Sequence, residues 1–541
     1  MTLLRSRRID TDVAIVGSGF AGSLLALVLR QRGMRVALLE RGRHPRFAIG
    51  ESSTPLAGLL IEELADRYDL PRLRPFSKWG TWQAAHPDVA CGRKRGFSFF
   101  QHDTGLPFAD DHTHARQLLV AASPNDTIAD THWYRPDFDH WLVREAEAAG
   151  VCYLDETSLD VPVFDQGHPV IEGTRRGASV RIDAAFLVDA SGPRGFLWSR
   201  LGLGDTPMGW LPPTQALYAH FEDVERWDAL VPSDSTPPYP VDDAALHHVL
   251  PGAWVWVLRF SNGVTSAGVA AIDAVARQYG LNEGADAWTR LLADYPSLQA
   301  QFTAARPIRP FVHAPRIAHR TALVAGRDWA LLPSAAGVID PLLSTGFPLT
   351  LLGIGRLARV LEDTSPGSAR EAALARYAQD TADELEATER LVAALYTNMS
   401  DFPLFKRLTA LYFAAASYAE TVRRLGQPDR ARGFLLHADP VFGPALRAIS
   451  GRALALTVGG ARHDARQRLL DDIAAAIAPF DVAGLGDTTR RDWYPVLESD
   501  LHAAHERLGV SHAAIDALLA RCGFGNATAH PPRVFAGQER A

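Results

Sequence analysis

The stretch DVAIVGSGFAGSLLALVLR (residues 12–30) decides the fold of this chain. It contains a short apolar strand, a glycine turn and an apolar helix, and RVALLE (residues 35–40) supplies the next strand. Gly17, Gly19 and Gly22 fit the pattern G-x-G-x-x-G. In this pattern the first glycine allows a tight turn, the second lets the backbone approach a pyrophosphate, and the third lets the helix pack on the sheet. The stretch therefore predicts an α/β fold with a Rossmann-type dinucleotide-binding domain.

An acidic residue follows the glycine turn at the distance typical of dinucleotide binding. Glu40 ends the second strand about 20 residues later, where a carboxylate accepts a hydrogen bond from a ribose 2′-hydroxyl. A carboxylate there would repel the 2′-phosphate of NADP, which leaves NAD or FAD as the ligand. We expect Phe20 and Ala21, at the start of the helix, to contact the same cofactor, together with Arg41 beside the acid.

Composition excludes several other classes of protein. The 541 residues carry a formal net charge of −7, so no basic surface for nucleic acid is predicted. A spanning helix needs about 20 apolar residues, and glycines interrupt the apolar run at residues 12–30, so no membrane span is expected. Three widely spaced cysteines favour a reducing cytoplasm over a disulfide framework. The histidine pairs lack metal-ligand spacing, so we expect no metal and place them in loops: His112 and His114, His247 and His248.

Further motifs occur in a fixed order along the chain. YRPDFDHWLVREAEAAG (134–150), AAFLVDASGPRG (184–195) and WALLPSAAGVIDPLLSTG (329–346) together resemble the FAD monooxygenase superfamily of the hydroxybenzoate-hydroxylase type. Within it, GESSTP (50–55), two tryptophans in WVWVLRF (254–260) and the segment DPLLSTG resemble flavin-dependent halogenases. The resemblance covers about residues 10–360. It implies FAD as the cofactor, with the reduced form supplied by a separate flavin reductase.

The order of the motifs predicts how the chain is divided. Residues 1–204 are expected to form the FAD-binding part, interrupted near residues 90–130 by strands of an interleaved antiparallel substrate domain. Residues 205–305 continue the substrate-side sheet, and the pair Asn262-Gly263 predicts a hairpin turn within it. Residues 306–360 return to the FAD-binding part. An alanine-rich pattern with few prolines predicts helices over residues 361–541, ending in a loosely held tail.

The resemblance implies a lysine between flavin and substrate that holds or carries hypohalous acid. Lys94, in GRKRGFSFF, fits the K-x-G-x-x-F stretch of halogenases that act on phenolic and pyrrolic substrates. Lys78, in PFSKWGTW, lies at a spacing from Glu51 closer to that of the tryptophan halogenases. We favour Lys94 and keep Lys78 as the alternative. A charge on a solvated strand edge would explain either residue without catalysis.

Two segments are implied to approach the flavin from the N-terminal half. Glu51 and Ser52, in GESSTP, would line the cofactor, and Glu51 is a further catalytic candidate. A helix cap supplied by one of residues 52–54 explains the same segment. Arg135 lies just before the predicted helix DFDHWLVREAEAAG (137–150) and would approach the cofactor, although a helix N-terminal ion pair with Asp139 explains it equally well.

The loop at residues 331–346 departs from the family pattern. The family usually has Gly-Asp where this chain has Pro333 and Ser334. Loss of that acid removes a charge-assisted bond to the ribityl hydroxyls and costs about 1–2 kcal/mol if the site is buried. The resemblance places several other residues of the loop at the flavin: Ala336, Gly337, Asp340 and Gly346.

The end of the same loop is implied to hold the halide. The residues concerned are Ser344, Thr345 and Gly346. Leu343 stands where tryptophan halogenases have a glutamate, which argues against free tryptophan as the substrate.

The two tryptophans of WVWVLRF correspond to the W-x-W-x-I-P signature of halogenases. Trp254 and Trp256 would keep the substrate away from the flavin, and Arg259 replaces the proline. A strand with alternate residues in a core explains the pattern equally well.

These motifs together favour a flavin-dependent halogenase of specialised-metabolite biosynthesis that acts with chloride or bromide on an electron-rich phenolic, pyrrolic or indolic substrate. They leave open whether that substrate is free or tethered to a carrier protein. An FAD-dependent aromatic hydroxylase that uses NAD(P)H is the alternative enzyme. A degenerate flavoprotein scaffold is a third reading, for which Pro333, Ser334 and Arg259 are the evidence. Four aromatic residues are candidates for the lining of the substrate pocket, although core packing explains them too: Tyr396, Phe402, Phe405 and Phe413.

Overall fold

The computed structural model describes residues 7–165, 168–231, 235–456 and 462–524. The predicted loosely held tail falls almost entirely on residues 525–541, outside the described ranges. None of the helices in those ranges combines the length and the apolar character that crossing a bilayer requires.

The first sheet confirms the Rossmann prediction. Strand β1 (Arg7–Val16) pairs in parallel with β2 (Val36–Leu39) and β11 (Ala178–Asp189), and α1 (Phe20–Gln31) connects β1 to β2. The sheet order is β7-β2-β1-β11-β10-β8, with β20 beside β11 and β9 beside β10. Every residue of β2 is buried, as expected for a parallel strand covered on both faces. The bounds of the other strands are β7 Cys152–Leu154, β8 Thr157–Leu159, β9 Val163–Asp165, β10 His168–Arg175 and β20 Trp329–Leu331.

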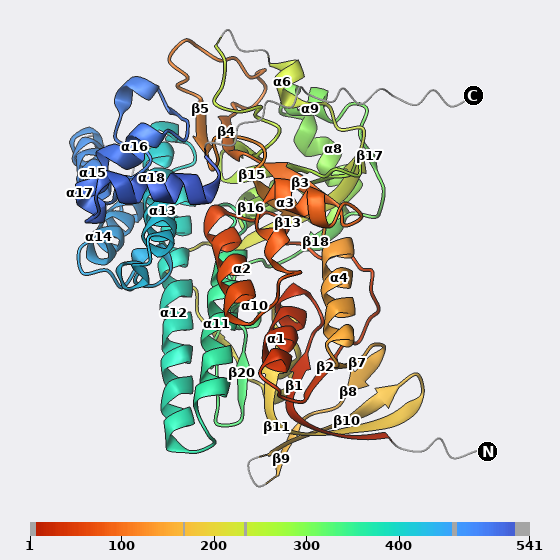
Figure 1. Ribbon diagram of the computed structural model, residues 1–541. Helices are drawn as coiled ribbons and strands as arrows, with labels where there is room; N and C mark the ends of the chain where they lie inside the picture. The colour runs from red at the N-terminus through yellow and green to blue at the C-terminus, as the bar shows by residue number, and fades with distance from the viewer. Residues whose placement is uncertain (1–6, 166–167, 232–234, 457–461, 525–541) are drawn as a thin grey trace.

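A second sheet lies above the first in Figure 1. Its order is β17-β13-β16-β15-β14-β4-β5-β22, with β18 beside β13. The β15–β16 pair is antiparallel, and Gly263 between them has a φ of 83°, which confirms the predicted hairpin turn. The bounds are β4 Gly96–Gln101, β5 Gln117–Ala121, β13 Thr214–Glu222, β14 Ala245–Leu250, β15 Ala253–Arg259, β16 Thr265–Ile272, β17 Arg306–Pro307, β18 Val312–Ala314 and β22 Trp493–Tyr494.

Short elements connect the two sheets. Strands β3 (Cys91–Lys94) and β6 (Asp130–Trp133) form a separate antiparallel pair near the helix α2 (Pro55–Arg67). The small three-stranded sheet β12-β19-β21 comprises Asp205–Thr206, His319–Thr321 and Gly337–Val338. The helices of this part are α3 Trp79–Ala85, α4 Arg135–Ala148, α5 Phe196–Leu201, α6 Trp227–Leu230, α7 Asp273–Tyr279, α8 Ala285–Ala293, α9 Pro296–Gln301 and α10 Pro333–Ala336.

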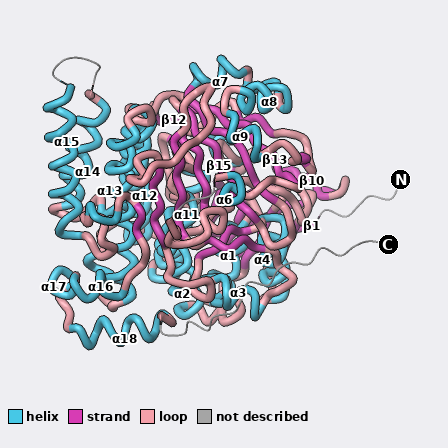
Figure 2. The backbone as a smooth tube through the Cα atoms, turned by 90° about the horizontal axis from the view of Figure 1, so that it is seen from above, coloured by secondary structure: helices cyan, strands magenta, loops and turns pink. Residues whose placement is uncertain are grey.

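The C-terminal third is helical apart from β22, which adds a two-residue strand to the second sheet. Helices α14 to α18 lie outside the strands when the molecule is seen from above (Figure 2). The domain boundaries given above remain a prediction. The helices are α11 Gly346–Asp363, α12 Ser368–Thr397, α13 Phe402–Arg424, α14 Phe442–Leu454, α15 Arg462–Ile477, α16 Glu498–Ala503, α17 His505–Leu508 and α18 His512–Cys522.

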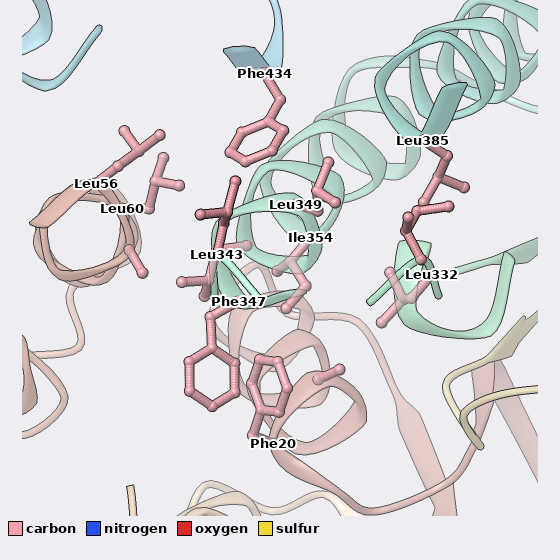
Figure 3. Packing of buried hydrophobic residues seen from close by; sticks show 14 of the residues in the cluster. Phe20, Leu56, Leu60, Leu332, Leu343, Phe347, Leu349, Ile354, Leu385 and Phe434 are labelled. Carbon is pink, nitrogen blue, oxygen red and sulfur yellow. The ribbon is translucent and has the colours of Figure 1, made fainter. Parts of the chain in front are cut away.

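One large apolar core joins the Rossmann sheet to the helices. Phe347 of α11 meets Phe20 of α1 edge to face, with ring centroids 5.0 Å apart, and Leu343 lies close by in the same packed region (Figure 3). Because α1 and α11 share this core, the glycine turn and the end of the 331–346 loop are held in a fixed relation to each other.

The loop assignment of His247 and His248 is wrong. Both residues lie in β14 and are buried, one on each face of the second sheet. His247 stacks on Phe99, with centroids 4.4 Å apart, and His248 Nε2 donates a hydrogen bond to Gln301 Oε1 at 2.9 Å. Other parts of the protein cover both faces of β14. The polar character of these two histidines therefore does not mean that they are exposed.

Candidate active site

The glycine turn has the geometry that its sequence pattern predicts. Gly17 has a φ of 101°, and a Cβ there would lie 2.5 Å from the Ala190 carbonyl oxygen. A Cβ on Gly22 would lie 1.9 Å from the Gly17 oxygen, so α1 packs closely against the turn. Gly19 is less crowded, and with Phe20 and Ala21 it opens onto a cavity of about 550 Å³. The N-terminus of α1 therefore faces a space large enough for a ligand.

Segments far apart in the sequence meet around this cavity, which we call the flavin cavity. Its wall includes many of the predicted residues: Gly19, Phe20, Ala21, Glu51, Ser52, Arg135, Trp254, Trp256, Ser334, Gly337, Asp340, Ser344, Thr345 and Gly346. Five predicted cofactor residues are not part of this wall: Gly17, Gly22, Glu40, Arg41 and Ala336. Gly17 and Gly22 shape the turn, Ala336 is buried behind the loop, and Arg41 is exposed.

Glu40 is a buried carboxylate held by the turn. Its Oε2 accepts hydrogen bonds from the Ser18 backbone N–H at 3.1 Å and from Arg46 at 3.3 Å, and its Oε1 accepts from the Gly42 N–H at 2.9 Å. Burial raises the pKa of Glu40, but Arg46 and these donors outweigh burial, so the pKa lies below its usual value. Glu40 is therefore ionised at neutral pH, as the ribose-binding prediction requires.

Glu51 pairs with a residue that sequence reasoning missed. Its Oε1 lies 2.7 Å from His220 Nε2, and both side chains are almost fully buried. The other oxygen, Oε2, has no hydrogen-bond partner in the part of the chain that the structure describes. The helix-cap role in this segment belongs to Thr54, whose hydroxyl accepts from the Ala57 N–H at 3.2 Å. Glu51 is thus free of a capping role and presents a carboxylate at the cavity wall.

Arg135 makes the predicted ion pair with Asp139 and also lines the flavin cavity, while its contact with the cofactor stays a prediction. It makes a two-bond ion pair with Asp139, with N–O distances of 2.7 Å, and it also donates to the backbone oxygen of Gly50 at 2.8 Å. The guanidinium lies over the Phe20 ring, 5.0 Å from its centroid. The arginine therefore ties α4 to the GESSTP segment and to the start of α1 while it lines the cavity.

These residues fit FAD. Two helix N-termini, those of α1 and α11, reach the cavity wall and favour an anionic pyrophosphate or halide. The unpartnered Glu51 Oε2 is a buried acceptor that a ligand donor would satisfy. A Cβ on Gly346 would meet nothing within 4 Å, so the start of α11 leaves space for a bound group.

The altered loop keeps its place at the flavin cavity. Pro333 begins α10, a position that tolerates proline, and packs on α11 where Gly353 leaves room for it. Ser334 follows, half-buried, and lines the cavity. Pro333-Ser334 in place of Gly-Asp thus offers the cofactor a hydroxyl where the family has a carboxylate, while the backbone of the loop stays at the cavity.

Replacing Ser334 with aspartate is expected to tighten FAD binding about tenfold, because a charge-assisted hydrogen bond to a hydroxyl is worth about 1–2 kcal/mol more than a neutral one. Isothermal titration of the two proteins with FAD measures the change. Ser199→Asp, on an exposed face of α5, is the charge-matched control and should leave the affinity unchanged. Equal affinities of wild type and Ser334→Asp would contradict this assignment of Ser334.

Lys94 is fully buried, so it is not a charge on a solvated edge. Its Nζ donates to Ser52 Oγ at 2.9 Å and to the Ser53 carbonyl at 2.5 Å, and it lies 3.5 Å from Ser344 Oγ. Burial lowers the pKa of Lys94 to about 7, and Asp130 acts in the opposite direction. An amine with such a pKa exists in both protonation states near neutral pH, as general acid–base groups do.

Ser344 adopts a strained conformation that brings it to Lys94. Its φ is 54°, in the left-handed region that residues other than glycine rarely occupy. Thr345 follows as the N-cap residue of α11, an 18-residue helix. Strain of this kind costs of order 1–3 kcal/mol and is typical of functional sites. Ser344 therefore lies next to Lys94, and all three predicted halide residues stand at the N-terminus of α11.

A second cavity of about 470 Å³ lies on the other side of Lys94. Phe97 lines it, and Lys94 Nζ is 3.7 Å from the centroid of that ring. Lys78 also lines the second cavity and is absent from the wall of the flavin cavity. Thr54 and Pro55 belong to the wall of the second cavity, whereas Glu51 and Ser52 belong to that of the flavin cavity. The GESSTP segment and Lys94 together separate the two spaces.

The tryptophan strand faces the flavin cavity. Trp254 and Trp256 alternate along β15, as predicted, and both line this cavity. Arg259 does not line it; instead it pairs with Asp242 at 3.0 Å and donates to the Val224 carbonyl at 2.9 Å. The replacement of proline by arginine therefore secures the end of the strand and does not alter the cavity.

The predicted aromatic lining divides into two groups. Phe413 lines the second cavity, together with Tyr412. Phe402 and Phe405 are fully buried and stack on each other in the core. Tyr396 accepts a hydrogen bond from Trp254 Nε1 at 3.0 Å and donates to Asp340 Oδ2 at 2.8 Å.

A Rossmann sheet, a glycine turn with its acid and a cavity that fits FAD define an FAD-dependent oxidoreductase. The family model of tryptophan halogenases matches residues 124–428, and that of NAD(P)-binding Rossmann-like domains matches residues 15–61. The chain belongs to the tryptophan halogenase family and is a flavin-dependent halogenase. These matches favour halogenation over the hydroxylase and scaffold alternatives.

Named relatives agree with this assignment. The tetracycline 7-halogenase of Kitasatospora aureofaciens is 28% identical over 418 residues, which cover 75% of this chain and 73% of the relative. A 1H-pyrrole-2-carbonyl-[peptidyl-carrier protein] chlorinase of Pseudomonas fluorescens is 25% identical over 349 residues, 63% of this chain and 73% of that one. The crystal structure of the halogenase PltM in complex with phloroglucinol and FAD superposes with a TM-score of 0.76 at 25% identity, over 89% of this chain and 99% of that chain.

Proposed function

We propose that this halogenase oxidises chloride or bromide in the flavin cavity and halogenates an electron-rich aromatic ring in the second cavity, with Lys94 between them. The observation that carries the proposal is the place of Lys94. Its Nζ touches Ser52 and Ser344 of the flavin-cavity wall and also the ring of Phe97, which lines the second cavity. Reduced FAD, when bound, supplies the oxygen chemistry that oxidises the halide.

The halide is held at the start of α11. The Thr345 and Gly346 N–H groups and the positive end of the helix dipole favour an anion there. Ser344 Oγ, 3.5 Å from Lys94 Nζ, links this position to the lysine. Lys94 then holds hypohalous acid through the N–H that faces Ser344 Oγ, the longest of its three contacts at 3.5 Å, and presents it toward the second cavity.

The second cavity suits a flat apolar substrate. Phe97, Tyr412 and Phe413 offer aromatic surfaces, and Lys78 offers a cation at the same wall. We assign Lys78 to substrate binding, and Glu51 with His220 to the flavin side. Leu343 is buried among apolar residues, so the acid that would accompany free tryptophan is absent from that position. A phenolic or pyrrolic ring, free or tethered to a carrier protein, is the substrate class we infer.

A separate flavin reductase would supply the reduced cofactor. Ser334, in place of an acid, weakens the hold on the ribityl chain, which suits a cofactor that binds and leaves in each cycle. Trp254 and Trp256 close the flavin cavity on the side of the second sheet, where they would keep the aromatic substrate from the flavin.

A reductase-coupled assay tests this function. The purified protein, FAD, NADH, a flavin reductase and phloroglucinol are incubated with and without chloride or bromide, and products are analysed by mass spectrometry. A halogenated product that needs both halide and the reductase is the expected result. Hydroxylated product with NADPH and no reductase would overturn the proposal in favour of a hydroxylase.

A further inference from the structure

A buried acid lies opposite Lys94 and has no role in the scheme above. Asp130 of β6 is the direct cross-strand partner of Lys94 of β3. Side chains of directly opposed residues lie on the same face of an antiparallel pair, with Cβ atoms about 4.5–5.5 Å apart. Asp130 is 2% exposed, and its Oδ2 has no hydrogen-bond partner among the described residues. An unpartnered buried carboxylate oxygen is costly, so its retention calls for a reason.

The acceptors around Lys94 favour its ammonium form. Its Nζ has three oxygen acceptors: Ser52 Oγ, the Ser53 carbonyl and Ser344 Oγ. An ammonium has three N–H donors to offer, whereas a neutral amine has two. A buried ammonium in turn needs a counter-charge. Asp130 is the acid whose charge acts on Lys94.

The elements packed on Lys94 and Asp130 bring further titratable groups close to this pair. His132 of β6 and His247 of β14 lie near Lys94, and burial lowers the pKa of both, that of His247 to about 3, so both are neutral at neutral pH. Around Asp130, Lys78 and Arg424 favour the carboxylate and Glu420 opposes it. The Trp79 N–H donates to the Ala129 carbonyl at 2.8 Å, which places Lys78 beside the strand that carries Asp130.

We propose that Asp130 is a positioning residue that keeps Lys94 in its ammonium form, and so keeps the three-acceptor geometry that carries hypohalous acid between the two cavities. This inference rests on the proposed role of Lys94. Burial raises the pKa of Asp130 to about 7 against the opposing effect of Lys78 and Lys94, so its charge responds to pH in the range where the enzyme would work.

The chain has three lysines, which makes a direct measurement of the Lys94 pKa practical. Protein labelled with [13Cε]lysine gives three side-chain signals, assigned with the variants Lys78→Met and Lys406→Arg. Titration of the Lys94 signal in the wild type and in Asp130→Asn compares the two pKa values. Because an opposite charge nearby shifts a pKa by about 1–3 units, the Asp130→Asn variant should titrate at least about one unit lower.

Controls separate a charge effect from a change of structure. Asp242→Asn removes another buried carboxylate, the partner of Arg259, and should leave the Lys94 titration unchanged. Asp130→Ser, smaller and also neutral, gives the same test should the asparagine variant not fold. An unchanged Lys94 pKa in a folded Asp130 variant, or an equal shift in Asp242→Asn, overturns the proposal.

Activity supplies the second measurement. The halogenation rate of Asp130→Asn should approach that of the wild type at low pH, where Lys94 is protonated in both, and fall at least about tenfold below it above pH 7. A deficit that is the same at every pH would mean a structural role and overturn the proposal. A lowered Lys94 pKa with halogenation unaffected would uphold the link between Asp130 and Lys94 and refute instead the role given to Lys94 above.

Discussion

Lys94→Met is expected to lower halogenation at least about 10³-fold while leaving FAD binding within a few-fold of the wild type. Methionine fills most of the lysine volume but offers no N–H donor, so nothing between the cavities holds hypohalous acid. Removal of a single well-placed donor costs about 10²–10³ in rate, and the variant also leaves Ser52 Oγ, the Ser53 carbonyl and Ser344 Oγ without the lysine as their donor. The flavin cavity keeps its wall, because Lys94 is not part of that wall.

Two other lysine variants serve as controls for this prediction. Lys406→Arg keeps the ion pair with Asp492, lines neither cavity and should halogenate normally. Lys78→Met should chiefly raise the KM of the substrate, since Lys78 lines the second cavity but not the flavin cavity. Product yield from the reductase-coupled assay and FAD titration measure both effects. Full activity in Lys94→Met, with loss in Lys78→Met, would show that the catalytic lysine is Lys78.

Local patterns carried most of the sequence-based prediction of the fold. Gly17 and Gly22 are needed because a Cβ at either position would collide with backbone atoms, and this steric demand is visible in the sequence as the G-x-G-x-x-G spacing. The alternation of Trp254 and Trp256 was likewise predictable from the two-residue period of a strand. The loop 331–346 lines the flavin cavity even with Pro333 and Ser334 in it, because α10 accepts proline at its first position.

Long-range partners were beyond the reach of sequence. His220 is 169 residues from Glu51, and Asp130 pairs with Lys94 through a strand register that no local pattern states. His247 and His248 were placed in loops because polar residues are usually exposed, whereas layers on both faces of β14 bury them. Lys94 was favoured from its K-x-G-x-x-F stretch, but its burial is visible only in the structure, where the β3–β6 pair and α2 enclose it. Its catalytic role stays a prediction. Tertiary packing, and not local secondary-structure propensity, decides the burial and the partners of such residues.

Tyr396→Phe is expected to destabilise the protein by about 2–4 kcal/mol at pH 8 and by less at pH 5. The hydroxyl joins three elements, accepting from Trp254 Nε1 at 3.0 Å and donating to Asp340 Oδ2 at 2.8 Å. Its loss leaves both buried groups without that partner, at about 1–3 kcal/mol each. Asp340 starts the segment that carries Ser344 and Thr345, so we also expect weaker binding of FAD.

The pH dependence follows from Asp340. Burial raises the pKa of this carboxyl to about 7, while Tyr396 and the Leu342 N–H act to lower it. A folded-state pKa above the unfolded value means that the stability this group contributes is complete below about pH 4 and is lost as the pH rises through about 7. The Tyr396 hydroxyl offsets part of that loss, because it donates to the ionised carboxylate. Removing it therefore costs more at pH 8, where Asp340 is largely ionised, than at pH 5.

Tyr377→Phe is the matched control for this prediction. Tyr377 lies on the same helix, α12, and its buried hydroxyl donates to the Leu331 carbonyl at 2.6 Å. Its removal breaks a neutral hydrogen bond of about 1 kcal/mol, with little dependence on pH. Urea unfolding of wild type and both variants at pH 5 and pH 8, followed by tryptophan fluorescence, measures the two losses. Equal losses for Tyr396→Phe at both pH values would show that Asp340 is neutral throughout, and that the hydroxyl acts only as a link between β15 and the flavin loop.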